Sequence, residues 1–155
     1  MTEAAPQDAP SSGRFQGREH ILPVRVYYED TDFTGLVYHA NYVRYFERGR
    51  SDFLRLAGVS HTDLLERDDP AAFVITRMEI DFRSAARIDD ALEVRTTYDS
   101  VKGPRLNISQ RVLRGETLIA QASVEAACIS LDGRARRPPK GLVEVLAPWF
   151  SVGAP

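Results

Sequence analysis

The sequence predicts an α+β domain in which one long helix packs on a face of an antiparallel β-sheet. Apolar residues recur at intervals of three and four between positions 42 and 56, which is the spacing of one helix face. Polar and apolar residues alternate before this stretch and in four consecutive segments after it, as in strands. A single helix beside consecutive, closely spaced strands is typical of the α+β class.

The composition predicts one globular domain. Of the 155 residues, 43% are hydrophobic and 27% are charged, and a domain of this size buries about 70% of the surface that its unfolded chain exposes. The formal net charge of -2 provides no general attraction to nucleic acid or acidic membranes. Cys128 is the single cysteine, and no Cys/His pair has zinc-like spacing. Since no secretory signal or bilayer-spanning segment is found either, we expect a cytoplasmic protein without membrane insertion, nucleic-acid partner or metal.

The sequence predicts a disordered leader over residues 1–20 and a folded domain over residues 21–150. The leader is rich in Ala, Pro, Ser, Gln and Gly and has no periodicity. His20 and His61 have no partner signal, so we expect both at the surface. The folded domain opens with a strand in the segment ILPVRVYYE (21–29).

The long helix is predicted from Ala40 to a C-cap at Gly58. Its apolar stripe contains Tyr42, Phe46, Gly49, Phe53 and Leu56. Glycine inside a helix costs about 1 kcal/mol relative to alanine, so Gly49 predicts a close approach between the helix and the sheet. A capping motif at Ser60 predicts a second, short helix that stops before Pro70.

Four alternating segments follow, and we expect a meander in which each strand pairs with the next. The segments are FVITRMEIDFR (73–83), ALEVRTTY (91–98), RLNISQRVLR (105–114) and TLIAQASVEAACISL (117–131). Turn residues separate them. The segment KGLVEVLAPWF (140–150) predicts a closing helix that Pro148 interrupts.

Three acidic residues and a histidine lie where the first strand gives way to the long helix, in EDTDFTGLVYH (29–39). Taken alone, Asp30-Thr31-Asp32 is typical of a polar turn, since Asp and Thr cap helices and bend loops. A D-x-D pair also clamps metals in nucleotide-sugar sites, but such sites need an α/β fold that this order of elements does not provide. Gly35 is suited to a positive φ or to a close approach by a substrate.

This junction resembles the hotdog-fold acyl-CoA thioesterases of the 4-hydroxybenzoyl-CoA thioesterase family, and within it the bacterial branch associated with the Tol-Pal system. The resemblance is carried by RVYYEDTDFTGLVYHANYVRYFERGR (25–50), with support from DFRSAARIDDALEV (81–94) and RRPPKG (136–141). Leu36 departs mildly, because the family tends to a β-branched residue there. The resemblance implies a hotdog fold, in which an antiparallel sheet wraps around one central helix.

The resemblance also implies the roles of the site residues. Asp32 corresponds to the catalytic carboxylate, which acts as a general base toward water or as a nucleophile that forms a mixed anhydride. Backbone N–H groups near Tyr38 and His39 would stabilise the oxyanion at the start of the helix, and the His39 side chain would position water or the acyl group. The phosphates of coenzyme A need cations, for which the candidates are Lys102, Arg105, Arg134, Arg136, Arg137 and Lys140.

The implied function is hydrolysis of an acyl thioester, carried by coenzyme A or by an acyl carrier protein, without a metal or redox cofactor. Two alternatives stay open: a hotdog hydratase or dehydratase, and a non-catalytic module that binds acyl thioesters or acts as a scaffold. A lone hotdog subunit leaves a sheet edge open, so we expect a homodimer or a homotetramer with each site at the dimer interface.

Overall fold

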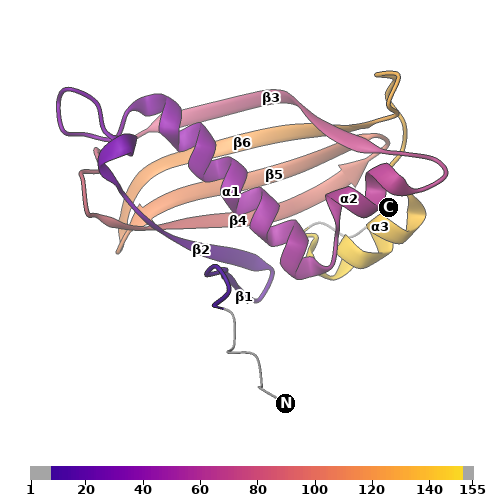
Figure 1. Cartoon of the computed structure of the whole chain (residues 1–155), viewed down its shortest axis with the longest axis horizontal. Coiled ribbons are helices and arrows are strands. Elements are labelled where there is room, and N and C mark those ends of the chain that lie inside the picture. The colour runs from indigo at the N-terminus through magenta and orange to yellow at the C-terminus, as the bar shows by residue number, and fades with distance from the viewer. Residues whose placement is uncertain (1–7, 152–155) are drawn as a thin grey trace, which may run out of the picture.

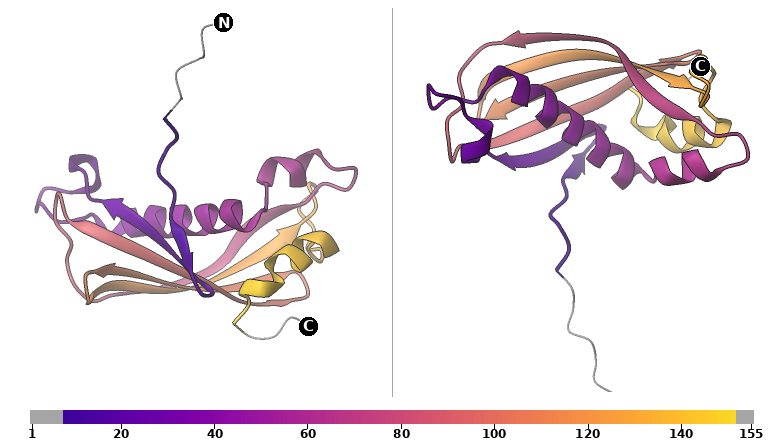
Figure 2. Two further views of the ribbon diagram at one scale, coloured as in Figure 1. Left: turned by 90° about the horizontal axis from the view of Figure 1, so that it is seen from below. Right: turned by 45° about the horizontal axis from the view of Figure 1, so that its top comes forward.

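The computed structural model describes residues 8–151, which form a six-stranded antiparallel sheet with one long helix across a face (Figure 1). The strands are β1 (Arg14–Gln16), β2 (Glu19–Arg25), β3 (Ala72–Phe82), β4 (Ala91–Lys102), β5 (Arg105–Arg114) and β6 (Thr117–Ile129). The helices are η1 (Tyr28–Asp30), α1 (His39–Ala57), α2 (His61–Glu66), α3 (Lys140–Leu146) and η2 (Ala147–Trp149). Figure 2 shows the sheet curving around α1, which confirms the predicted α+β class.

The order of the strands in the sheet is β1-β2-β4-β5-β6-β3. The predicted meander is therefore confirmed for β4, β5 and β6 and wrong for β3, which pairs with β6. The position beside β4 belongs to β2. The segment 83–90 carries the chain from one side of the sheet to the other, whereas only two residues separate β4 from β5 and β5 from β6.

Gly49 marks the predicted close approach between α1 and the sheet. A β-carbon placed there would lie 2.8 Å from Oγ1 of Thr96 and 2.8 Å from Cγ1 of Val94. Below the helix, Nε2 of Gln110 donates to the carbonyl oxygen of Phe46 and to Oγ1 of Thr96, both at 2.9 Å. Since these groups are buried, the hydrogen bonds remove the cost of leaving them unpaired and hold α1 at one height over the sheet.

The ends of the helices agree with the sequence prediction. Gly58 caps α1 with a φ of 99°, in the left-handed region that favours glycine. The hydroxyl of Ser60 accepts a hydrogen bond from the Asp63 N–H at 3.2 Å, as expected for a capped short helix. At the C-terminal side α3 stops at Leu146, and the chain continues as the 3-10 turn η2 that contains Pro148. No helix in the described part of the chain is both long and apolar enough to cross a bilayer.

The prediction of disorder up to residue 20 is wrong for residues 14–20. Residues 14–16 pair with β2, and the ring of Phe15 lies 4.9 Å from the rings of both Phe53 and Trp149. His20, expected at the surface, is 0% exposed, and its Nε2 lies 2.7 Å from Oδ2 of Asp52 on α1. These partners come from distant parts of the chain, so the composition of the segment did not indicate them. Residues 1–7 of the predicted leader lie outside the described residues.

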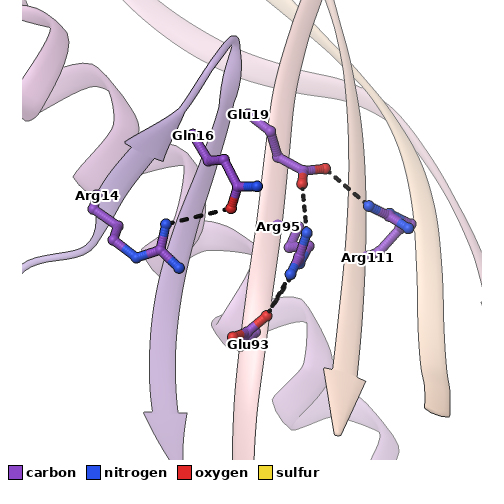
Figure 3. A network of polar contacts seen from close by, with 6 residues as sticks. All are labelled: Arg14, Gln16, Glu19, Glu93, Arg95 and Arg111. Carbon is purple, nitrogen blue, oxygen red and sulfur yellow. Dashed lines mark hydrogen bonds and ion pairs between the residues drawn. The ribbon is translucent and has the colours of Figure 1, made fainter. Parts of the chain in front are cut away.

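The face of the sheet opposite α1 is polar. Figure 3 shows Glu19 between Arg95 and Arg111, at 2.9 Å from each, with Arg95 also 2.9 Å from Glu93. In β4 the alternate residues Leu92, Val94, Thr96 and Tyr98 are buried toward the helix. The sheet therefore has one core face and one charged face, as the alternation in the sequence predicts.

Candidate active site

The loop 31–38 leads from η1 to the first turn of α1 and projects at one end of the molecule (Figure 1, left). Two isolated β-bridges fix it, one between Thr31 and Val37 and one between Leu36 and Arg87. Gly35 has a φ of 79°, which confirms the predicted positive φ. The loop is therefore a defined turn in which the position of Asp32 relative to α1 is set by the backbone.

Asp32 is held as an exposed carboxylate. Its Oδ1 accepts hydrogen bonds from Oγ1 of Thr34 at 2.6 Å and from the Thr34 N–H at 2.8 Å. These bonds lower the pKa of Asp32, and the electrostatic effect of the nearby His39 lowers it further. Among the described residues no group bonds to Oδ2, so one carboxylate oxygen is oriented and the other is free to react.

The start of α1 offers backbone donors, although not the pair that the resemblance implied. The Tyr38 N–H donates to the carbonyl oxygen of Asp30 at 2.9 Å, so it is occupied in this structure. Within the described residues the N–H groups of His39 and Ala40 have no acceptor, and Tyr38 provides no side-chain cap. The free donors are therefore those of His39 and Ala40. Ala40 was missed because the motif did not fix the residue at which the helix begins.

The neighbouring Asp30 has a structural role, as expected for a residue of a polar turn. Oδ2 of Asp30 accepts the Tyr27 N–H at 2.8 Å, which caps η1. The Asp30 carbonyl also accepts Nδ2 of Asn41 at 2.7 Å, in addition to the Tyr38 N–H. Asp30 therefore joins η1 to the start of α1 and leaves Asp32 as the carboxylate available for chemistry.

Aromatic side chains surround the loop and leave it open to solvent. The His39 ring is 4.6 Å from the Tyr38 ring and 6.2 Å from the Phe82 ring at the end of β3. Phe33 is fully exposed, and Tyr28 and Tyr38 are exposed as well. Exposed aromatic rings therefore lie beside an open carboxylate.

The six predicted phosphate ligands lie at the other end of the sheet from Asp32. They occupy the β4–β5 turn and the segment after β6, whereas Asp32 lies in the loop that precedes the other end of α1, a helix of 19 residues that is about 28 Å long. Four of them face carboxylates, among them Arg134 at 3.6 Å from Asp132, Arg136 at 2.7 Å from Asp69 and Lys140 at 3.8 Å from Glu144. One chain therefore does not bring these cations to Asp32.

Arg136 in particular is a structural residue in this chain. Its Nη1 also donates to the carbonyl oxygens of Asp69 at 3.2 Å and Pro70 at 3.4 Å. These contacts tie the segment after β6 to the loop before β3. Arg105 lies 3.7 Å from Glu125, which leaves Lys102 and Arg137 without an ion pair in the described part of the chain.

A groove of about 530 Å³ lies between α1 and β3 and includes Val43, Ile75 and Met78. A smaller and deeper cavity of about 110 Å³ shares Glu47, Arg50 and Ile75 with it. The deeper cavity ends among the apolar side chains of Leu54, Phe73, Leu106, Ile108 and Ala126 and the ring of Tyr98. Both hollows are therefore lined by the charged side chains of Glu47 and Arg50 together with apolar side chains.

Comparisons with known proteins agree with this arrangement. Residues 26–150 match the family model described as the thioesterase-like superfamily. A Haemophilus influenzae protein named acyl-CoA thioesterase YbgC is 44% identical over 110 residues, which cover 71% of this chain and 80% of that protein. An Escherichia coli protein named acyl-CoA thioester hydrolase YbgC is 42% identical over 123 residues, which cover 78% of this chain and 90% of that protein.

Solved structures give the same result. A probable thioesterase from Bartonella henselae superposes with a TM-score of 0.75 at 42% identity, covering 78% of this chain and 99% of the other. A 1,4-dihydroxy-2-naphthoyl-CoA thioesterase from Synechocystis has a TM-score of 0.75 at 22% identity, a likeness that concerns the fold alone. The predicted hotdog fold and family are thus confirmed. The match over residues 26–150 contains the loop with Asp32 and the whole of α1, and the chain belongs to the thioesterase-like superfamily.

Proposed function

We propose that this protein hydrolyses acyl-CoA thioesters, with Asp32 as the catalytic carboxylate. The observation that supports this most directly is the pairing of a free carboxylate oxygen with two free backbone donors across one short loop. Thioester hydrolysis needs both groups: one to activate or deliver oxygen, and one to receive negative charge on the carbonyl oxygen. The relatives named above carry acyl-CoA thioesterase names.

Two routes lead from this geometry to the same products. In the first, Oδ2 of Asp32 removes a proton from water, the hydroxide attacks the thioester carbonyl, and the proton passes to the departing sulfur. In the second, Oδ2 attacks the carbonyl, the thiolate leaves, and water hydrolyses the mixed anhydride. In both routes the N–H groups of His39 and Ala40 donate to the oxyanion. The same chemistry applies to a thioester carried by an acyl carrier protein, which is a second candidate substrate.

We infer further that two copies pair through β3. This strand has 11 residues and pairs on one side only among the described residues, and Val74 and Ile75 on it are 40% and 46% exposed. A long unpaired edge with apolar side chains favours association. Antiparallel pairing of two β3 strands would place residue 72 of one copy beside residue 82 of the other. The α1–β3 groove of each copy would then lie near the Asp32 loop of the other and could hold the acyl group.

The oligomeric state tests this inference. Light scattering coupled to gel filtration should give a dimer, or a tetramer made of two such dimers. A stable monomer with full activity would contradict the pairing through β3.

Replacement of Asp32 tests the activity itself. Asp32→Asn keeps the size of the side chain and its bonds to Thr34 but removes the base and the nucleophile. We expect kcat to fall about 10²-fold to 10⁴-fold while acyl-CoA binding survives, measured as thiol release and by calorimetry. Asp30→Asn is the matched control, because an amide oxygen can still accept the Tyr27 N–H, and it should cost little. Near-normal turnover by Asp32→Asn would refute the assignment.

A single turnover in heavy-oxygen water with enzyme in excess separates the two routes. Label in the Asp32 carboxylate indicates attack by the side chain, because hydrolysis of the anhydride leaves water oxygen on the enzyme. Label in the product acid alone indicates that water attacked the acyl carbon, and the base route then requires that hydroxylamine traps no anhydride on Asp32.

A further inference from the structure

The segment that links β3 to β4, residues 83–90, lies at the same end of the molecule as the Asp32 loop and supports it (Figure 1, left). The Val37 N–H donates to the carbonyl oxygen of Ala86 at 2.9 Å. Next to it, the carbonyl oxygen of Leu36 accepts the Asp32 N–H at 3.0 Å. The position of Asp32 relative to the start of α1 therefore depends on where the backbone of this segment lies.

Backbone hydrogen bonds fix the two ends of the segment. The Arg83 N–H donates to the carbonyl oxygen of Ile119 at 2.8 Å, and the Asp89 N–H donates to that of Val26 at 2.9 Å. Residues 85–87 lie between these two anchors and belong to neither β3 nor β4. Their position depends on a separate set of contacts.

Arg114, the last residue of β5, provides these contacts. Its Nη1 donates to the carbonyl oxygen of Ala85 and to Oδ2 of Asp90, both at 2.9 Å. The same carboxylate oxygen accepts the Arg87 N–H at 2.9 Å. One guanidinium nitrogen thus joins both sides of the turn that carries Ala86. We call the pair formed by Arg114 and Asp90 the arginine clamp.

The arginine clamp is better suited to fixing a position than to stabilising the fold. The side chains of Arg114 and Asp90 are 38% and 25% exposed, and an ion pair that solvent reaches contributes little to the free energy of unfolding. Its hydrogen bonds are still directional, because bonds between charged groups are short and aligned. Arg25 provides a contrast, since it donates at 2.8 Å to the Asp89 carbonyl, at the end of the segment that Val26 already fixes.

The proposed reaction depends on the distance between two groups that this segment supports. The Asp32 carboxylate and the free N–H donors of His39 and Ala40 must reach the same thioester. A displacement of about 1 Å between reacting groups can lower a rate by about 10²-fold. Val37 lies between the two groups in the chain, and its N–H bonds to the segment that the clamp holds. A change in the clamp therefore alters their alignment.

We propose that Arg114 and Asp90 are positioning residues for thioester hydrolysis: by fixing residues 85–87, they set the distance between the Asp32 carboxylate and the oxyanion donors. This inference rests on the proposed function and adds residues that act through the backbone rather than on the substrate. The segment DFRSAARIDDALEV (81–94) supported the family resemblance without a role for its residues. The clamp gives a role to Asp90.

Steady-state kinetics of the full chain tests the proposal. In Arg114→Gln, kcat for an acyl-CoA should fall about tenfold to 10²-fold with KM nearly unchanged, because the reacting groups lose their alignment while the substrate contacts remain. Arg114→Lys should recover part of this loss, since a single nitrogen serves both acceptors. Arg111→Gln removes another arginine of β5 and its ion pair with Glu19, and should leave kcat unchanged. Equal losses in Arg114→Gln and Arg111→Gln would overturn the proposal, and so would a higher KM with the parent kcat.

Asp90 separates a positioning role from a direct contact between Arg114 and the substrate. Asp90→Asn weakens the clamp and leaves the guanidinium in place, so kcat should fall in this variant too. The double variant should lose no more than the worse of the two single variants, because both changes break one clamp. If Asp90→Asn keeps the parent kcat, the positioning role is refuted. A fall in kcat that only follows the folded fraction in urea denaturation would refute it as well.

Hydrogen exchange provides a measurement that does not depend on activity. The Val37 N–H should exchange about tenfold faster in Arg114→Gln than in the parent or in Arg111→Gln, since its acceptor Ala86 is no longer held. Unchanged exchange at Val37 would overturn the clamp whatever the activity. An unchanged kcat in Arg114→Gln beside an active parent would refute the positioning role and leave the thioesterase activity standing. If the parent hydrolyses no thioester, the proposed function fails, and the exchange rate still decides whether the clamp fixes the loop.

Discussion

Two pairs of aspartate and histidine lie along α1, and they contain the same groups in opposite surroundings. Asp52 and His20 are buried and bonded to each other at 2.7 Å. Asp32 and His39 are exposed, and Asp32 bonds to Thr34 instead. The buried pair has the geometry of a catalytic dyad, yet Asp52 is saturated by Gly13, His20 and Arg55. The exposed pair keeps a free carboxylate oxygen beside free backbone donors.

The difference teaches that available bonding capacity, rather than proximity of an acid to a histidine, identifies the reactive group. Burial acts to raise the pKa of Asp52, but bonds from Gly13, His20 and Arg55 outweigh it and lower the pKa. Asp32 has a lowered pKa without burial, mainly through Thr34. Both groups are therefore carboxylates at neutral pH. One stabilises the fold, and we propose that the other performs the chemistry.

The largest expected effect on stability comes from removing Asp52. Asp52→Ala leaves the buried His20 ring and the Gly13 N–H without their acceptor, so the free energy of unfolding should fall by about 3 kcal/mol. Urea denaturation measures this. Asp32→Ala is the matched variant and should leave the free energy of unfolding nearly unchanged, because its carboxylate is exposed. Similar losses in the two variants would contradict the distinction between the pairs.

The sequence predicted the features that depend on neighbouring residues. Gly58 as a helix cap, Ser60 as an N-cap, Gly35 at positive φ and Gly49 as the point where α1 approaches the sheet all follow from local stereochemistry and spacing. It did not predict the burial of His20, whose partner lies 32 residues away.

Two further errors had the same origin. β3 was expected beside β4, but β2 pairs with that side of β4 through a long-range contact. The free donors at the start of α1 are His39 and Ala40 because the Asp30 carbonyl captures the Tyr38 N–H. Neither contact produces a periodic pattern of residues from which it could be predicted.

A second prediction concerns Phe15 and Phe33, which lie in segments of similarly polar composition. Phe15 packs its ring on Phe53 and Trp149, whereas Phe33 is fully exposed. Phe15→Ala should lower the free energy of unfolding by about 2 kcal/mol, less than for a fully buried ring because Phe15 is only partly buried. Phe33→Ala should change it little. Both values come from the same denaturation experiment, and equal effects would show that residues 14–16 do not pack on the core.

A smaller effect concerns pH. Burial lowers the pKa of His20 from its usual 6.5, although the hydrogen bond from its ring to Asp52 and the charge of Asp52 oppose this, while the Arg55 charge adds to it. The unfolded chain then binds a proton more readily than the folded chain. The contribution of neutral His20 to the free energy of unfolding is therefore complete above pH 6.5 and declines as the pH falls below it. The slope for one proton is at most about 1.4 kcal/mol per pH unit.

His20→Gln sharpens this test, since its Nε2 can still donate to Asp52 but does not titrate. The decline in stability just below pH 6.5 should be absent in this variant, while the acid loss due to Asp52 below its usual pKa of 3.8 should remain. An unchanged decline in His20→Gln would assign the effect to another group.

The smallest expected effect concerns the exposed pair and the hydroxyl that orients it. Thr34→Val removes the Oγ1 bond to Oδ1 of Asp32 but keeps the bond from the Thr34 N–H. Because these bonds lower the pKa of Asp32, losing one should raise that pKa, so the acidic limb of the kcat/KM profile should move to higher pH. Thr31→Val is the matched control, since its hydroxyl bonds to the Tyr28 carbonyl in the same loop and does not touch Asp32. A shift in both variants would indicate a change in the loop, and a shift in neither would show that Thr34 does not set the protonation of the catalytic carboxylate.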